Sequence, residues 1–218
     1  MRLHFLLSPN SEIVPFNYQH YLIGVFHKWM GLNEIHDEVS LYSLSWLRGS
    51  RQIKGGLDYT NGAKWFISFW DEEIGRKLIN NAMNYPDVFC GMVIKEIIIQ
   101  ETPKFSSKET FSVSSPVFIR KYDSDKRAIH LTYKDKEADH YLTETLKRKM
   151  KGANIDYKVD VKFDRNYSAP KTKLVEINNI KSRASFCPVI LEGDPKGIQF
   201  AWNVGIGHSS GCGFGAIY

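Results

Sequence analysis

The sequence predicts an α+β fold of two successive domains, and three patterns lead to this prediction. The first half alternates strand-like and helix-like stretches in the order βαββαβ. The second half again shows strands and a helix, although the two halves share no residue-level repeat. A glycine-rich stretch follows near the end of the chain. The order βαββαβ is that of the ferredoxin-like fold, which RNA-recognition domains also use, so we expect two tandem ferredoxin-like domains over residues 1–104 and 105–218.

The period of the apolar residues marks each element of the first half. Alternating apolar residues over 2–8 predict the first strand. An apolar stripe at helical spacing from Asn17 to Met30 predicts a helix, which Gly31 ends. The remaining expected elements are strands over 39–47 and 63–69, a helix over 71–84 capped by its first residue, and a strand over 88–101.

The second half is expected to contain one helix among strands. Its first three elements are a strand over 111–121, a helix over 136–151 and a strand over 157–163. Only strands are expected after them, over 174–178, 181–190, 198–204 and 214–218. The second domain is therefore predicted to have a degenerate last helix, whose place the glycine-rich loop takes.

The glycine-rich loop is the most informative motif of the chain. Residues 205–215 contain five glycines. Glycine adopts positive φ freely and has no side chain, so the amides of such a loop can close around phosphate oxygens. The loop lacks the Gly-Lys-Ser/Thr of a Walker motif and does not open a βαβ unit. We expect it to connect two strands and to bind an extended anion, with a plain turn as the alternative.

Composition favours a soluble protein with a polyanionic partner. The 218 residues carry a net charge of +5, and the sequence pI is near 9.0. No apolar run is long enough to span a membrane and no signal peptide is recognisable, so a cytoplasmic protein without a membrane partner is expected. The three cysteines show no Cys-x-x-Cys spacing, so neither a disulfide framework nor a metal site is expected, and no cofactor.

Three segments together carry a resemblance to a known family. They are the terminal glycine-rich loop, the segment Phe111-Ser-Val-Ser-Ser-Pro116, and the segment Val14-Pro-Phe-Asn-Tyr-Gln-His-Tyr-Leu22 followed by Gly24. In this order they resemble the CRISPR-associated repeat-RNA endoribonucleases of the Cas-six family, across essentially the whole chain. The resemblance implies metal-independent cleavage of CRISPR precursor RNA within its repeats, which yields guide crRNA with a 2′,3′-cyclic phosphate and a 5′-hydroxyl. Repeat RNA is the implied partner, while a CRISPR interference complex and a homodimer remain open.

Metal-free RNA cleavage requires a base, an acid and a group that stabilises charge on the phosphate. Histidine suits the first two roles because its pKa is near neutrality. By resemblance, the catalytic histidine is matched by His36, and its partner on the first helix by His27, with Gly31 supplying the bend between them. The alternatives are a solvated loop histidine and a surface helix position. Some members carry a lysine after the loop histidine, where this chain has Glu38.

Basic and glycine residues provide the candidates for RNA binding. Three cations of the connection after the second strand could replace the missing lysine, and an ordinary solvated loop is the alternative. The expected RNA-binding residues are Arg48, Arg51, Lys54, Arg120, Lys158, Gly205, Gly207, Ser209, Ser210, Gly211, Gly213 and Gly215. Two other functions stay open: a catalytically inactive repeat-RNA-binding subunit, and an unrelated small-molecule enzyme on the same fold, which would need a compact apolar pocket.

Overall fold

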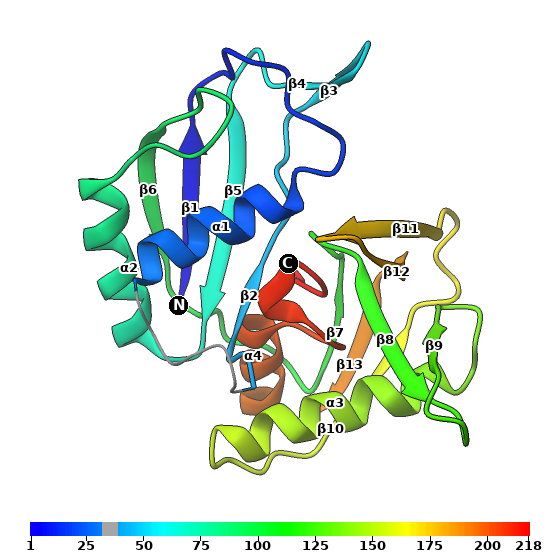
Figure 1. Cartoon of the computed structure of the whole chain (residues 1–218). Coiled ribbons are helices and arrows are strands. Elements are labelled where there is room, and N and C mark those ends of the chain that lie inside the picture. The colour runs from blue at the N-terminus through cyan, green and yellow to red at the C-terminus, as the bar shows by residue number, and fades with distance from the viewer. Residues whose placement is uncertain (32–38) are drawn as a thin grey trace.

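Four antiparallel strands form the sheet of the amino-terminal half in the computed structural model, which describes residues 1–31 and 39–218 (Figure 1). The spatial order of the strands is β2-β5-β1-β6. The elements of this half are β1 (Arg2–Leu7), α1 (Gln19–Met30), β2 (Tyr42–Leu44), β3 (Arg51–Ile53), β4 (Gly56–Asp58), β5 (Ala63–Phe69), α2 (Glu72–Asn84) and β6 (Ile94–Gln100). β3 and β4 form a separate hairpin beyond the sheet (Figure 1).

The alternation in β1 explains how the first core forms. Leu3, Phe5 and Leu7 are buried on one face of the central strand, as their period of two predicts. The ring of Phe5 stacks on Trp29 of α1 with centroids 5.2 Å apart. The apolar stripe of α1 therefore packs on the face of the sheet that β1 presents.

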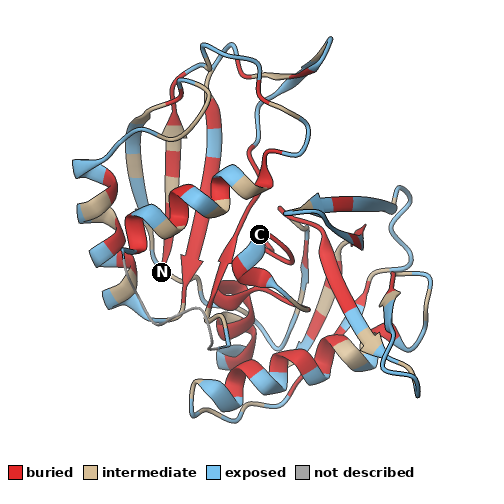
Figure 2. Cartoon of the chain, in the orientation of Figure 1, coloured by how far each residue is buried: buried red, intermediate tan, exposed pale blue. Residues whose placement is uncertain are grey.

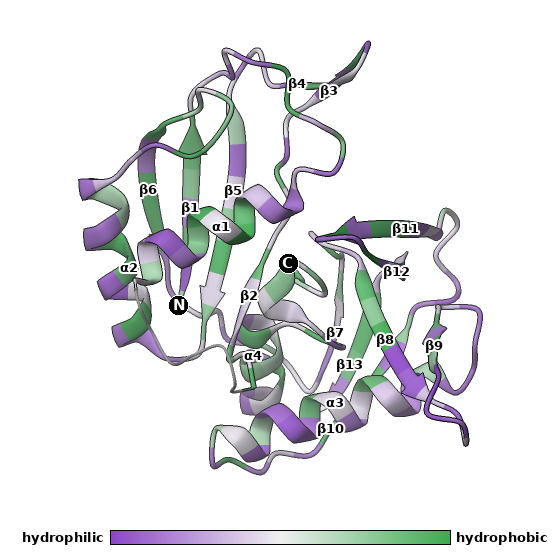
Figure 3. Ribbon diagram, viewed as in Figure 1, coloured by the Kyte–Doolittle hydropathy of each residue, from purple (hydrophilic) through white to green (hydrophobic). Residues whose placement is uncertain are grey.

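Two further sheets build the carboxyl-terminal half, with strand orders β10-β13-β7 and β11-β12-β8-β9. The elements of this half are β7 (Lys108–Phe111), β8 (Val117–Tyr122), β9 (Ala128–Leu131), α3 (Ala138–Gly152), β10 (Val159–Phe163), β11 (Lys171–Ile177), β12 (Ile180–Phe186), β13 (Val189–Gly193), α4 (Pro195–Val204) and a 3₁₀ turn (Ser210–Cys212). α3 is amphipathic (Figure 3), and its Leu142 and Leu146 enter a core shared with Val161 of β10. The mixed content of helices and strands confirms the α+β class.

The predicted strand over residues 198–204 is wrong, because these residues form part of helix α4. Pro195 occupies the first turn, where its fixed φ suits a helix and its missing N–H costs no hydrogen bond. Ile198, Ala201 and Trp202 then recur at helical spacing and are buried. The second domain therefore keeps a regular last helix, and the expectation of a degenerate one is also wrong. The terminal segment forms an isolated bridge between Ile217 and Val113 in place of the expected strand.

A buried arginine ties the two halves together. The Arg2 guanidinium donates hydrogen bonds to the Ser68 hydroxyl (2.6 Å) and to the carbonyl oxygens of Trp202 (3.2 Å) and Ile217 (2.7 Å). It also lies 3.5 Å from the centroid of the Trp202 ring. Burial lowers the pKa of Arg2 to about 8. The first strand thus holds α4 and the chain terminus in place.

None of the described helices has the length and apolar character needed to cross a membrane.

Candidate nucleic-acid interface

The glycine-rich loop follows α4 and is mostly buried between the two halves (Figure 2). Gly205, Gly207, Gly213 and Gly215 all have positive φ, between 63° and 76°. Close backbone approaches explain this choice of residue: a Cβ on Gly215 would collide with the carbonyl oxygen of Ile206. These glycines are therefore required by the packing of the loop itself.

The amides of the loop fall into two groups. The first group donates to carbonyl oxygens of the protein and is not available to a ligand in this structure; it comprises the amides of Gly205, Ile206, His208, Cys212, Gly213 and Gly215. The second group donates to no acceptor in the described part of the chain, and comprises the amides of Gly207, Ser209, Ser210 and Gly211. The middle of the loop is thus the part that can offer N–H donors to an anion.

The side chain of Lys149 on α3 binds the start and the middle of this loop. Its ammonium donates to the carbonyl oxygens of Val204 (2.9 Å) and Gly205 (3.1 Å) and to the Ser210 hydroxyl (2.8 Å). The Ser210 hydroxyl in turn donates to the carbonyl oxygen of Tyr42 (3.0 Å). Burial lowers the pKa of Lys149 to about 7. The Ser210 side chain, predicted to bind RNA, is therefore engaged inside the protein, whereas Ser209 is exposed.

A pocket of about 160 Å³ opens where the loop meets α3. It is lined by Val39, Ser40, Thr145, Arg148, Lys149, Gly207, His208, Ser209 and Ser210. His208 is half-buried, and its Nδ1 accepts a hydrogen bond from the Arg120 amide (3.3 Å), which assigns the ring proton to Nε2. Burial, followed by the charges of Arg120 and Arg148, lowers the pKa of His208 to about 4. A neutral imidazole, an arginine and loop amides thus surround the pocket.

The two proposed catalytic histidines are placed differently by the structure. His36 lies outside the described residues. His27 is half-buried in the last turn of α1, edge-on to Phe26 with centroids 5.4 Å apart. Gly31 ends this helix with φ 76°, as predicted. The pairing of the two histidines stays a prediction.

Aromatic side chains connect the carboxyl-terminal end of α1 to the glycine-rich loop. The rings of Phe26 and Tyr42 lie with centroids 4.7 Å apart. Tyr42 in turn packs against the loop, because a Cβ on Gly211 would lie 2.9 Å from its hydroxyl oxygen. The carboxyl-terminal part of the first helix and the middle of the loop are therefore neighbours.

The three cations of the β3–β4 region do not line the pocket. Arg51 pairs with Asp58 across the hairpin at 2.8 Å. Arg48 lies 3.8 Å from the centroid of the Tyr218 ring and donates to the Ser114 hydroxyl (2.7 Å). Lys54 is exposed in the hairpin turn. Their predicted RNA contacts therefore belong to a region separate from the pocket.

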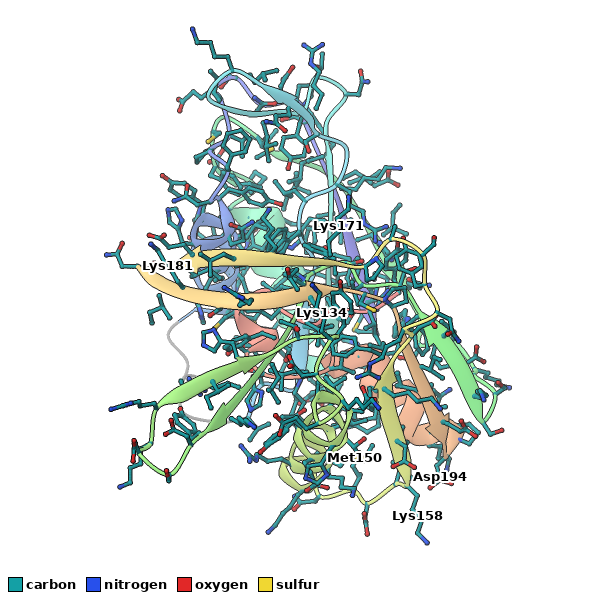
Figure 4. The ribbon with its side chains drawn as sticks, turned by 90° about the vertical axis from the view of Figure 1, so that its right-hand side faces the viewer. Lys134, Met150, Lys158, Lys171, Lys181 and Asp194 are labelled. Carbon is teal, nitrogen blue, oxygen red and sulfur yellow. The ribbon has the colours of Figure 1, made fainter. Side chains whose placement is uncertain are left out.

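The two remaining predicted cations differ in position. Arg120 is exposed on β8, and its amide contacts the pocket histidine. Lys158 lies beside Asp194 at the lower end of the molecule, away from Lys171 and Lys181 on the β11–β12 hairpin (Figure 4). Lys158 thus lies apart from the basic residues of the β11–β12 hairpin.

Sequence reasoning missed Lys149 and Arg148. Lys149 falls on the apolar stripe of α3, three residues after Leu146, and a lysine at a core position is unusual. This lysine within the apolar stripe was the sequence signal that could have identified a buried, functional side chain. Arg148 gives no signal of its own, because an arginine on an exposed helix face is common.

Comparisons with known proteins place the fold and the family. A protein described under "Characterization of a Cas6-related gene from Pyrococcus furiosus" is 18% identical, with a TM-score of 0.86 over 100% of this chain and 97% of that one. A second structure, "An RAMP protein binding different RNA substrates", is 19% identical, with a TM-score of 0.84 over 100% and 98% of the two chains. Thermus thermophilus Cse3, "bound to an RNA representing a pre-cleavage complex", is 12% identical, with a TM-score of 0.54 over 100% and 97%.

These similarities confirm the tandem ferredoxin-like fold. The search of curated proteins gives no match. The family model "CRISPR associated protein Cas6, C-terminal" matches residues 100–218, which is more than half of the chain and includes the whole glycine-rich loop. With that loop, its pocket and this match, the chain belongs to the Cas6 family of CRISPR-associated proteins.

Proposed function

We propose that this chain is an endoribonuclease that cleaves CRISPR precursor RNA within its repeats without a metal ion. The observation that carries the proposal is the family match over residues 100–218, which contain the loop with available amides. The RNA complex of the structurally similar Cse3 and the RNA substrates of the similar RAMP protein support RNA as the ligand. The net charge of +5 suits a polyanion.

The proposed reaction is an internal transesterification. The ribose 2′-oxygen attacks the adjacent phosphorus, and the bond from phosphorus to the 5′-oxygen breaks, leaving a 2′,3′-cyclic phosphate and a 5′-hydroxyl. One imidazole of the pair His27 and His36 accepts the proton of the 2′-hydroxyl, and the other donates a proton to the departing 5′-oxygen. The loop amides and a cation stabilise the charge on the phosphate.

A single assay with end-labelled repeat RNA in excess EDTA tests this proposal. Wild type should cut at one position and leave a cyclic phosphate, identified by its resistance to phosphatase before mild acid treatment. His36→Ala and His27→Ala should each lower the single-turnover rate by about 10²-fold or more, the scale of a lost acid or base. His20→Ala is the matched control, because His20 lies on the same helix two turns earlier and bonds only to the Asn17 carbonyl oxygen within the described chain.

Three results would contradict the proposal. RNA that is bound but left intact by wild type would identify a binding subunit instead of a nuclease. Cleavage that EDTA abolishes would contradict the metal-independent reaction. Unchanged rates in both histidine variants would place the proton transfers on other residues.

A further inference from the structure

Among the described residues that line the loop pocket, three have side chains that can carry positive charge, and they differ in what each can offer to a ligand. They are Lys149, His208 and Arg148. The cation that metal-free cleavage requires must stay charged near neutral pH and must have donors left for the phosphate. Each of the three can be tested against these two requirements.

Lys149 meets neither requirement. Its three hydrogen bonds to Val204, Gly205 and Ser210 use all three N–H donors of an ammonium group. Its pKa, lowered to about 7 by burial, leaves it only partly charged at neutral pH. Lys149 organises the loop and has no donor left for a ligand.

His208 contributes a donor without charge. Burial is the main cause that lowers its pKa to about 4, so the ring is neutral at physiological pH. Since its Nδ1 accepts the Arg120 amide, the Nε2–H is the donor that remains. The imidazole can therefore hydrogen-bond a phosphate oxygen and cannot neutralise it.

Arg148 meets both requirements. A guanidinium carries a delocalised positive charge and presents a planar fork of donors that fits two phosphate oxygens. The side chain is exposed, and within the described chain it donates no hydrogen bond and forms no ion pair. The Glu144 carboxylate lies one helical turn away, and Lys147 first, then the charge of Arg148 more weakly, lower its pKa. Lys147, the neighbour of Arg148, is in contrast paired with Glu144 at 2.9 Å. The same pocket is lined by Gly207, Ser209 and Ser210, whose amides are available.

We infer that Arg148, from the second domain, is the cation that holds a phosphate of the bound RNA in the loop pocket, together with the available amides that line it. This inference rests on the proposed function for its ligand. It replaces the three cations expected from the connection after the second strand, which do not line the pocket.

A double-mutant cycle between protein and RNA tests the inference without requiring cleavage. The RNA is the repeat with one 2′-deoxy nucleotide at the mapped cut, or unmodified repeat if wild type leaves it intact. A neutral methylphosphonate replaces each phosphate in turn, and Kd is measured for wild type, Arg148→Ala and the control Lys147→Ala. Arg148→Ala should raise Kd by about 5- to 100-fold for the fully charged RNA, the scale of a charge-assisted contact. At one phosphate, the methylphosphonate and Arg148→Ala should together raise Kd no more than either change alone.

The outcomes separate this inference from the proposed nuclease. If the effects of Arg148→Ala and of the methylphosphonate on the binding free energy add at every phosphate, the inference is overturned, even if wild type cleaves RNA. The same holds if Lys147→Ala couples to the methylphosphonate at that phosphate as strongly as Arg148→Ala does. Coupling at one phosphate with RNA that wild type leaves intact would support the inference and contradict the nuclease. Failure of wild type to bind repeat RNA would overturn both. The melting temperature of Arg148→Ala should equal that of wild type, because the side chain is exposed.

Discussion

The lysine beneath the glycine-rich loop gives the sharpest stability prediction. Lys149 is almost fully buried, with 6% of the residue exposed, and its ammonium binds the carbonyl oxygens of Val204 and Gly205 at the carboxyl-terminal end of α4. Lys149→Met keeps the length of the side chain and removes the donors. The carbonyl oxygens of Val204 and Gly205 then lose a buried partner, which costs about 1–3 kcal/mol for each unsatisfied group. Removal of the desolvated charge offsets part of this cost, so we expect a destabilisation of about 2 kcal/mol near pH 7.

The pH dependence of this difference has a definite sign. The pKa of Lys149 is about 7 in the folded protein and near 10.4 in an unfolded chain. Between these values the unfolded state binds more protons, so the stability of wild type rises with pH relative to the variant. The rise should approach about 1.4 kcal/mol per pH unit. The difference between wild type and Lys149→Met should therefore widen from pH 7 to pH 9.

Urea denaturation at pH 7, 8 and 9 checks this prediction, with the free energy of unfolding extrapolated to water for each protein. Lys151→Met is the matched control, since Lys151 is exposed on the same helix and its substitution should leave the free energy of unfolding close to that of wild type. A wild-type minus Lys149→Met difference that stays constant or narrows with pH would refute the burial argument.

Three other stability predictions concern Gly215, Arg2 and His208. Gly215→Ala should lower the free energy of unfolding by more than about 2 kcal/mol in urea denaturation, because its φ is 63° and a Cβ would collide with the Ile206 carbonyl oxygen. Gly24→Ala is its control and should be neutral or stabilising by up to about 1 kcal/mol, since no atom lies within 4 Å of its Cβ position. Arg2→Met should cost about 3 kcal/mol by thermal unfolding, through three lost hydrogen bonds, two of which join the halves. The free energy of unfolding of wild type should fall relative to that of His208→Gln as pH falls from 6.5 to 4, because in this range His208 binds a proton in the unfolded state more readily than in the folded one. An equal dependence of unfolding free energy on pH in the two proteins would contradict this prediction.

The sequence predicts those elements whose signal is local. The period of two in β1 and the helical stripes of α1 and α3 depend on side chains close in sequence, and the structure places these elements within one or two residues of the expected bounds. The expected strand over 181–190 covers two strands, β12 and β13, which enter different sheets on either side of Pro188. Proline cannot donate to a sheet ladder, so the break was visible in the sequence.

Helix α4 was misread for a different reason. Its short apolar stretch fits a buried strand as well as a buried helix, and periodicity alone does not separate the two. The deciding signal is the pair Asp194-Pro195 at its start, which is typical of a helix beginning. The roles of Lys149 and Arg48, in contrast, depend on contacts with residues more than 50 positions away, and no local pattern contains that information.

The glycine-rich motif combines two requirements that its sequence does not distinguish. Gly205, Gly213 and Gly215 use their conformational freedom to fold the loop, and their amides bond within the protein. Gly207 and Gly211 lie in the part of the loop whose amides are available. Gly211 has no positive φ, and space alone requires a glycine there, because a Cβ would press on Ser40 and Tyr42. Substitutions in either group should therefore lower stability, because a Cβ on Gly207 would also lie 2.6 Å from the Phe118 carbonyl oxygen. A loss of RNA affinity at Gly207 or Gly211 is thus to be read only beside the measured stability of the variant.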